Sequence, residues 1–166
     1  MPPGKIVRRL LGEKCFRRVG RFWRAIFVDL EAAAVSIDKF IPSNAFVLDI
    51  GGGDGEPINA LLKVRPDLHI AMIDISDKIG NFIEEDFLKK VSLFPSTSIQ
   101  QYVELKRHLP DVIMVNDVLH HIPYIERHLF LKEIFELSEN NPETVVIFKE
   151  VQPNGLRAHL GYLADC

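Results

Sequence analysis

Ala45-Phe-Val-Leu-Asp-Ile-Gly-Gly-Gly-Asp-Gly55 is the stretch of this chain that decides its fold. An apolar, β-prone run leads directly into a turn with four glycines. Parallel α/β proteins build a ligand cradle from a buried strand, a glycine turn and a helix, because glycine adopts φ > 0 and leaves bare backbone for the ligand. The amides that open the helix add hydrogen-bond donors and a positive dipole end. The stretch therefore predicts a strand that ends in a ligand-binding turn.

The spacing of the glycines selects among ligands. The dinucleotide fingerprint Gly-x-Gly-x-x-Gly requires a glycine at position 56, where the chain has Glu56. The pattern is instead Asp-x-Gly-x-Gly-x-Gly, and Asp49 is expected beneath the turn, accepting hydrogen bonds from loop amides. Asp49, Asp54 and Glu56 together would repel a pyrophosphate. A cationic ligand is therefore favoured, and a nicotinamide dehydrogenase is a distant alternative.

A second acid stands at the end of another apolar run. Residues 69–75 are separated from the glycine turn by an expected helix at 58–65, which Pro66 ends. Asp74 lies about 20 residues beyond the glycines, a position from which a carboxylate binds ribose hydroxyls. We therefore predict Asp74 as a ribose ligand, with a solvated turn aspartate as the plainer alternative.

A third strand tip is polar as well. Residues 111–118 are typical of a buried strand that becomes polar at Asn116 and Asp117. Ligands of open parallel sheets bind at the carboxyl ends of the strands, where the strand order reverses. The glycine turn, Asp74, Asn116 and Asp117 are therefore expected on one rim.

Residues 47–55 resemble the glycine motif of class I S-adenosylmethionine-dependent methyltransferases, and residues 111–123, with Leu-His-His, resemble their fourth strand. The resemblance covers roughly residues 45–151. It implies an α/β fold, a Rossmann-like three-layer αβα sandwich whose mainly parallel sheet has about five strands in the order 3-2-1-4-5. It also implies S-adenosyl-L-methionine as the cofactor. The cofactor-binding residues predicted on this basis are Asp49, Gly51, Gly52, Gly53, Gly55, Asp74, Ile75, Asn116 and Asp117.

His121 and His120 are the candidate catalytic residues, because the resemblance places one of them against the substrate. Adjacent helical residues diverge by about 100°, so at most one can face the site. Packing and capping at a helix start is the competing interpretation. Methyl transfer from a sulfonium is an in-line displacement that mainly needs alignment and exclusion of water, and it needs a base only if the acceptor loses a proton. No metal is expected, since no ligand cluster accompanies the histidines.

The remaining pattern predicts, in chain order, a helix over 77–90, a strand at 91–94, a loop or short helix over 96–108, a helix over 124–139 and a strand over 144–150. Gly80 weakens the first helix. The apolar face of the last helix consists of Phe130, Leu131, Ile134 and Leu137. No acid follows the third strand, so no adenine-binding residue is identified. For Lys149 and Glu150 a surface ion pair is favoured over a substrate contact.

Members of the family usually have seven strands, whereas only five are expected here, with a helix over 153–166. The chain is therefore interpreted as truncated or as a shortened variant. A fifth strand left at the edge of the sheet would favour pairing with another chain, and a homodimer is one expected consequence.

The N-terminal segment is strongly basic. Residues 1–26 contain eight Lys or Arg and one acid, Glu13, which gives +7 there and −10 for the rest of the chain. Apolar residues at helical spacing indicate a helix packed on its own domain, with its arginines in water. We expect a helical arm or cap over 1–42 and the cofactor-binding core over 43–166.

Composition limits the partners. Hydrophobic residues make up 47% of the 166, which is ordinary for a soluble globule, and no apolar run is long enough to span a bilayer. Cys15 and Cys166 give neither a disulfide framework nor zinc spacing. We expect a cytoplasmic protein with no membrane partner.

The leading functional hypothesis is methyl transfer to a small-molecule acceptor. A cofactor-binding module without turnover is the first alternative. An RNA or protein methyltransferase that uses the basic arm is the second, and nucleic acid is the less favoured partner.

Overall fold

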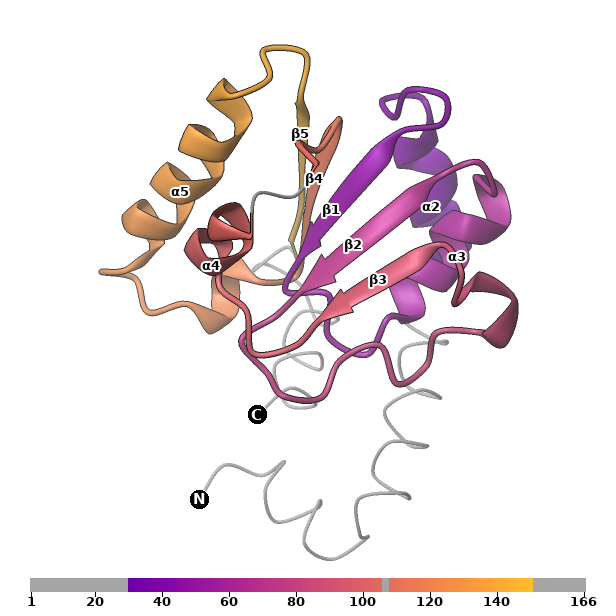
Figure 1. Cartoon of the computed structure of the whole chain (residues 1–166), viewed down its shortest axis with the longest axis horizontal. Coiled ribbons are helices and arrows are strands. Elements are labelled where there is room, and N and C mark those ends of the chain that lie inside the picture. The colour runs from indigo at the N-terminus through magenta and orange to yellow at the C-terminus, as the bar shows by residue number, and fades with distance from the viewer. Residues whose placement is uncertain (1–29, 106–107, 151–166) are drawn as a thin grey trace, which may run out of the picture. The chain divides into compact units, whose positions relative to one another are not determined.

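The computed structural model describes residues 30–105 and 108–150 (Figure 1). Contacts group Glu31–Glu150 into one compact unit. Most of the predicted N-terminal arm, and all of the helix predicted over 153–166, lie outside the described residues. None of the described helices is long and apolar enough to cross a membrane.

Five strands form one sheet in which every pairing is parallel. In space the order is β3-β2-β1-β4-β5. The strands are β1 Phe46–Ile50, β2 His69–Ile73, β3 Val91–Phe94, β4 Val112–Asn116 and β5 Val145–Lys149. This is the order that the sequence predicted, and the almost complete burial of β1 agrees with its central position.

Helices cover both faces of the sheet. In Figure 1, α2 (Leu30–Asp38) and α3 (Glu56–Val64) lie behind it, and α4 (Ile99–Glu104) and α5 (Arg127–Glu139) lie in front. Short 3₁₀ turns occur at η1 (Glu85–Phe87) and η2 (Leu119–His121). The predicted three-layer αβα sandwich is therefore confirmed.

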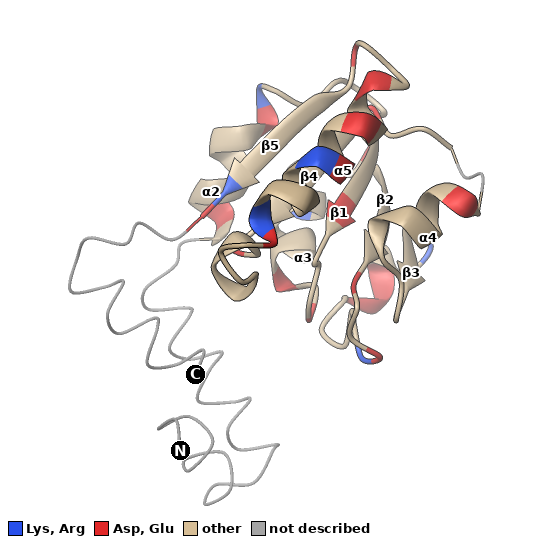
Figure 2. Ribbon diagram, turned by 90° about the vertical axis from the view of Figure 1, so that its left-hand side faces the viewer, with Lys and Arg blue, Asp and Glu red and all other residues tan. Residues whose placement is uncertain are grey.

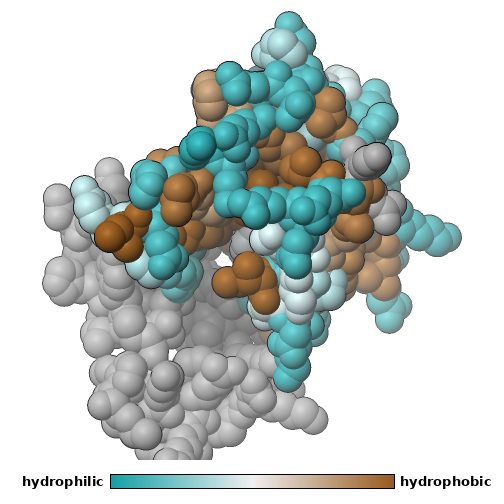
Figure 3. All heavy atoms as spheres, turned by 60° about the vertical axis from the view of Figure 1, so that its left-hand side comes forward, coloured by the Kyte–Doolittle hydropathy of each residue, from teal (hydrophilic) through white to brown (hydrophobic). Residues whose placement is uncertain are grey.

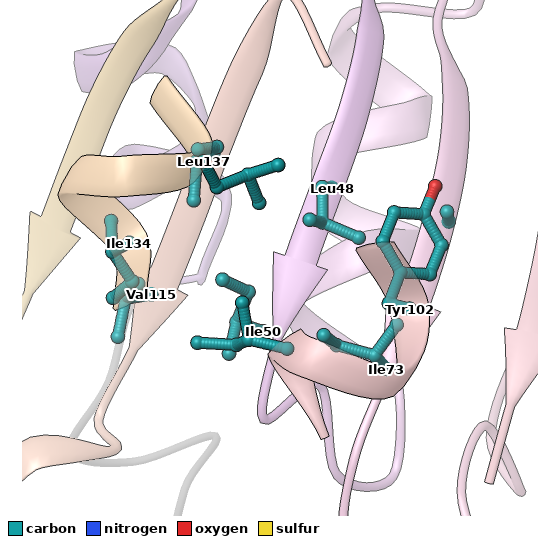
Figure 4. Packing of buried hydrophobic residues seen from close by; sticks show 10 residues of the cluster. Leu48, Ile50, Ile73, Tyr102, Val115, Ile134 and Leu137 are labelled. Carbon is teal, nitrogen blue, oxygen red and sulfur yellow. The ribbon is translucent and has the colours of Figure 1, made fainter. Parts of the chain in front are cut away.

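Strand alternation assigns the side chains of β1 to two different layers. Leu48 and Ile50 pack with Tyr102 of α4 and with Ile134 and Leu137 of α5 in the core that Figure 4 shows. Because successive strand residues point to opposite faces, Val47 and Asp49 face the layer of α2 and α3. A carboxylate therefore lies on the same inner face as the apolar side chains of that layer.

The helix predicted over 77–90 is wrong, since only η1 is helical there. Gly80 has φ +64°, which a right-handed helix does not allow. Its amide donates to the carbonyl of Gly53 at 2.9 Å, and the amide of Phe82 donates to that of Asp54 at 2.9 Å. The backbone of this segment is therefore bound to the glycine turn.

The predicted apolar face of α5 is partly wrong. Ile134 and Leu137 are buried and Phe130 packs against them, whereas Leu131 is 42% exposed. Spacings of four and three place Phe130, Ile134 and Leu137 in one stripe, and Leu131 falls outside it. Figure 3 shows that apolar residues also lie on the surface, among hydrophilic ones.

The edge at which the strands begin, here called the amino edge, is closed by Arg65. This side chain donates to both carboxylate oxygens of Asp67 at 2.8 Å and to Asp38 at 2.9 Å. It also donates to the carbonyls of Ile41 and Pro42. The Arg65 guanidinium and the backbone amide of Asn44 hold the pKa of Asp67 well below its ordinary value. The segment after α2 is thereby fixed to the start of β2.

Candidate functional site

The glycine turn lies at the opposite, carboxyl edge of the sheet and is fixed to the end of β2. The amide of Gly51 donates to the carbonyl of Ile73 at 2.8 Å, and the amide of Gly53 donates to Asp74 Oδ2 at 3.2 Å. Gly51, Gly53 and Gly55 all have φ > 0, and Gly55 precedes α3. The turn thus joins β1 to α3 along the tip of β2.

Contacts beneath the turn differ from those above it. A Cβ at Gly52 would lie 2.5 Å from Asp49 Oδ2 and 2.6 Å from Met72 Cε, so a side chain there would have to displace both buried residues. A Cβ at Gly53 would meet only the carbonyl oxygen of Gly51, at 3.9 Å. The turn is therefore packed from below at Gly52 and open at Gly53, as a cradle for a ligand requires.

Asp49 is the buried acid of the site, with 2% of its surface exposed. Its Oδ1 accepts a hydrogen bond from Asn116 Nδ2 at 3.3 Å. Burial raises the pKa of Asp49 to about 7, with the Asn116 hydrogen bond opposing the rise and the charge of Asp74 adding to it. The predicted hydrogen bonds from loop amides to Asp49 are not formed among the described residues, because Gly51, Gly52 and Gly53 donate to Ile73 and Asp74 instead.

Asp74 follows β2 and contacts the glycine turn. Its Oδ2 accepts from Gly53 and its Oδ1 accepts from the amide of Ser76 at 2.8 Å. Each carboxylate oxygen has a second lone pair, so both retain capacity for ligand hydroxyls. Ile75, the next residue, is 85% exposed and offers an apolar surface beside this carboxylate.

Asn116 and Asp117 end β4 but point to different partners. Asn116 bonds Asp49, which ties the tip of β4 to that of β1. Asp117 has φ +55°, an uncommon conformation for a residue other than glycine, and pairs with Lys149 of β5. Its Oδ1 is shielded from solvent and has no hydrogen-bond partner in the described part of the chain. A polar ligand group could satisfy this oxygen.

Lys149 and Glu150 each contact a side chain of the segment after β4, and they are not paired with each other. Lys149 pairs with Asp117, and Glu150 Oε2 lies 3.0 Å from His120 Nδ1. Figure 2 shows the basic and acidic residues together at this end of β5. The interpretation of Lys149 and Glu150 as a simple surface pair is therefore corrected.

Of the two candidate catalytic histidines, His120 is the one that a carboxylate holds among residues 30–105 and 108–150. Glu150 Oε1 also accepts from the amides of Val118 and Leu119, at 2.8 and 2.7 Å. Burial alone would raise the pKa of Glu150, but the hydrogen bonds from His120 and the two amides outweigh it and lower the pKa. His121 is exposed, and its ring centroid lies 4.0 Å from that of His120. In the described residues no cluster of three His, Cys, Asp or Glu side chains is arranged for a metal ion.

Asn59 is a site-shaping residue that the sequence interpretation missed. It lies on α3, is only 8% exposed, donates to the carbonyl of Phe82 at 2.6 Å and accepts from the amide of Glu84 at 3.0 Å. These bonds hold the segment around Gly80 against the glycine turn. The available signal was an amide side chain within the apolar run Ile58–Leu62 of a short helix.

Solved structures with this fold include three methyltransferases, each with a TM-score of 0.53. An O-methyltransferase family protein from Burkholderia thailandensis is 20% identical, and the match covers 73% of this chain and 38% of that one. The CurJ carbon methyltransferase is 18% identical, with coverage of 77% and 35%. The mitomycin 7-O-methyltransferase MmcR is 17% identical, with coverage of 90% and 48%. At these identities the likeness concerns the fold alone, and the chain spans less than half the length of each.

A search of curated proteins returns no match. The family model described as a methyltransferase domain matches residues 16–164, which is most of the chain. This match agrees with the sheet order and with the glycine turn at the tip of β1. The chain therefore belongs to the methyltransferase domain family, as its resemblance to class I methyltransferases predicted.

Proposed function

We propose that this chain binds S-adenosylmethionine at the carboxyl edge of the sheet and transfers its methyl group to a small-molecule acceptor. The observation that carries the proposal is the hydrogen bond of 3.2 Å from Gly53 to Asp74, because it brings the open part of the glycine turn and the ribose-binding acid together. The chemistry of the donor set fits the cofactor: carboxylates for hydroxyls and a cation, open backbone, and an exposed apolar side chain at Ile75.

Each strand tip has a separate part in the proposed binding mode. Asp74 would accept the ribose hydroxyl protons, with Ile75 beside the nucleoside. Asn116 and Asp117, one strand beyond β1, would face the amino-acid part, where the unpartnered Asp117 Oδ1 suits a donor group. When bound, the cofactor supplies a methyl group already activated by a positive sulfur.

The chain's own contribution to the chemistry is alignment, exclusion of water and, where needed, a proton acceptor. Glu150 binds His120 Nδ1 and thereby orients the imidazole after β4, where a histidine is suited to accept a proton from an acceptor hydroxyl or amine. His120 is therefore favoured over His121, although both were candidates.

Calorimetric titration with S-adenosylmethionine, S-adenosylhomocysteine and NAD tests the binding step. We expect both sulfur nucleosides to bind and NAD not to bind. Asp74→Asn should weaken both by about 10- to 100-fold, since it removes charge-assisted hydrogen bonds. Asp77→Asn, which changes an exposed acid of the same loop, is the matched control and should leave both affinities unchanged. Tight NAD binding or an unaltered affinity in Asp74→Asn would contradict the assignment.

Turnover separates an enzyme from a binding module. Incubation with cofactor labelled in the methyl group and a panel of hydroxyl and amine acceptors should yield labelled product. We expect His120→Ala to reduce the rate with a productive acceptor by about 10²- to 10⁴-fold and His121→Ala to change it little. Binding without product across the panel would favour the module, and steeply salt-dependent RNA binding would favour a nucleic-acid substrate.

A further inference from the structure

Asp49 lies directly beneath the backbone on which the cofactor is proposed to rest. Its Oδ2 is the atom closest to the position of a Cβ at Gly52, and its Oδ1 accepts its hydrogen bond from a neutral amide, Asn116. A carboxylate that is paired with an amide and almost fully buried keeps its charge uncompensated when it ionises. A cation placed on the other side of the turn would supply that compensation.

The elements around Asp49 bring few other charges to it. Its register partners, Met72 on β2 and Met114 on β4, are apolar, and α3 presents buried apolar side chains to this layer. The ionisable side chains at this edge in the described residues include Asp74, Asp77 and Lys78 after β2, Asp54 and Glu56 of the turn and the start of α3, and His121 with the pairs Asp117–Lys149 and His120–Glu150 beyond β4. Of these, the carboxylate of Asp74 repels a negative charge on Asp49 and so disfavours its ionisation.

The strand order indicates which part of the ligand lies over Asp49. A ligand held by Asp74 at β2 and by Asn116 or Asp117 at β4 must cross the tip of β1, which lies between those strands. Adjacent strands are about 4.8 Å apart, so the middle of the ligand passes over β1. In S-adenosylmethionine the sulfur lies between the ribose and the amino-acid part, so in the proposed binding mode it would be the portion over Asp49.

We propose that ionised Asp49 selects the methyl donor over its demethylated product, by attracting the positive sulfur of the donor through the glycine turn while leaving the neutral thioether unaffected. This inference rests on the proposed function and adds to it a residue that determines donor specificity. The charge acts across a low-dielectric layer of packed backbone, where Coulomb attraction is stronger than in water. Asp49 needs no direct contact with the ligand for this role.

The selection depends on pH. Because burial raises the pKa of Asp49 to about 7, its carboxyl is largely neutral in the free chain at pH 6 and largely ionised at pH 8. Linkage requires the donor, which binds the ionised form better, to bind more tightly as the pH rises through this range. The neutral product gains nothing from the ionisation, so the ratio of donor affinity to product affinity rises with pH.

The test measures that ratio in the 166-residue chain by calorimetry between pH 5.5 and pH 8.5. We expect the ratio of S-adenosylmethionine affinity to S-adenosylhomocysteine affinity to rise about tenfold in the unaltered chain, in line with a few ångströms of low-dielectric separation. In Asp49→Asn, which keeps the shape but cannot ionise, the ratio should change only through titration of the ligands themselves. Asp77→Asn should behave as the unaltered chain does.

Three results overturn parts of this scheme and are distinguishable. A ratio that stays constant with pH in the unaltered chain ends the inference, whatever the variant does, and so does an equal rise in Asp49→Asn. In both cases the nucleosides still bind and the proposed function stands. If neither nucleoside binds the unaltered chain at any pH, the proposed function itself fails.

Discussion

The two edges of the sheet differ in how their charged side chains are paired. At the amino edge, Arg65 binds two carboxylates and three carbonyls, and Asp111 accepts from the amide of Phe46 at 2.8 Å. At the carboxyl edge, the buried carboxylate of Asp49 is hydrogen-bonded only to the amide side chain of Asn116 among the described residues. The backbone of Asp117 has a left-handed conformation, and its Oδ1 has no hydrogen-bond partner in that part of the chain. The amino edge thus holds the fold together, whereas the carboxyl edge retains strain and unused polar capacity, as ligand sites do.

The largest effect is expected at the amino edge. Arg65→Ala should lower the free energy of unfolding by roughly 3 to 5 kcal/mol, because it removes several hydrogen bonds of one side chain at about 1 kcal/mol each. Urea unfolding measures the change. Lys132→Ala breaks an exposed pair with Glu136 and is the control, for which less than about 1 kcal/mol is expected. Equal losses in the two variants would contradict the special role of Arg65.

At the carboxyl edge, replacing the charged side chain of Asp49 should instead stabilise the folded chain. The folded pKa of Asp49, about 7, lies above its unfolded value, so the folded state holds a proton that the unfolded state releases between about pH 4 and pH 7. The unaltered chain therefore loses stability as the pH rises through that window. Asp49→Asn should not show this loss and should gain roughly 2 to 4 kcal/mol over the unaltered chain at pH 8, and little at pH 4.

Urea unfolding at several pH values, without ligand, measures this difference. A gain that is independent of pH would show that Asp49 is charged throughout the folded state or paired by another group.

Within the glycine turn, alanine substitutions can distinguish the packed position Gly52 from the open position Gly53. Gly52→Ala should cost about 2 to 3 kcal/mol, because its Cβ would overlap Asp49 and Met72. Gly53→Ala should cost only about 1 to 2 kcal/mol, for the left-handed φ of +52°, since its Cβ meets open space. Thermal unfolding ranks the two. A larger cost at Gly53 would contradict the described difference between the underside and the open side of the turn.

The smallest effect is expected at Asp117. Asparagine tolerates the left-handed region at least as well as aspartate, and the lost pairing with Lys149 is partly exposed. Asp117→Asn should therefore change the free energy of unfolding by less than about 1 kcal/mol. A greater loss in a urea titration would mean that this pair supports the fold, as Arg65 does at the other edge.

The sequence was sufficient for the parts of the molecule that depend on local pattern. The apolar runs gave all five strands, and the polar residues that end them marked the rim. The hydrogen-bond partners of the site residues could not be predicted in this way, because they depend on contacts between distant parts of the sequence. Asp49 is bound by Asn116, which lies 67 residues away, and Glu150 reaches back 32 residues to the amide of Val118. Nothing local distinguishes these partners from a loop amide or a neighbouring lysine.

The helix predicted over 77–90 was wrong for a related reason. Its apolar residues have helical spacing, yet Gly80 and Phe82 bond the glycine turn, and Asn59 bonds the carbonyl of Phe82. Tertiary hydrogen bonds therefore override a weak helical pattern that Gly80 had already made less stable. For Leu131, a shift of one residue around the helix was enough to move it out of the buried stripe.

The long reach of the Asn116–Asp49 and Glu150–Val118 bonds also has a kinetic consequence. Contacts between residues distant in sequence pay more loop-closure entropy, so they form later than local ones. On a ribosome, β1 and the glycine turn emerge well before β4 and β5, yet they lack Asn116 and the Glu150–His120 pair until those later segments are made. We therefore expect the proposed cofactor site to be completed only in late steps of folding, after the Arg65 corner has formed.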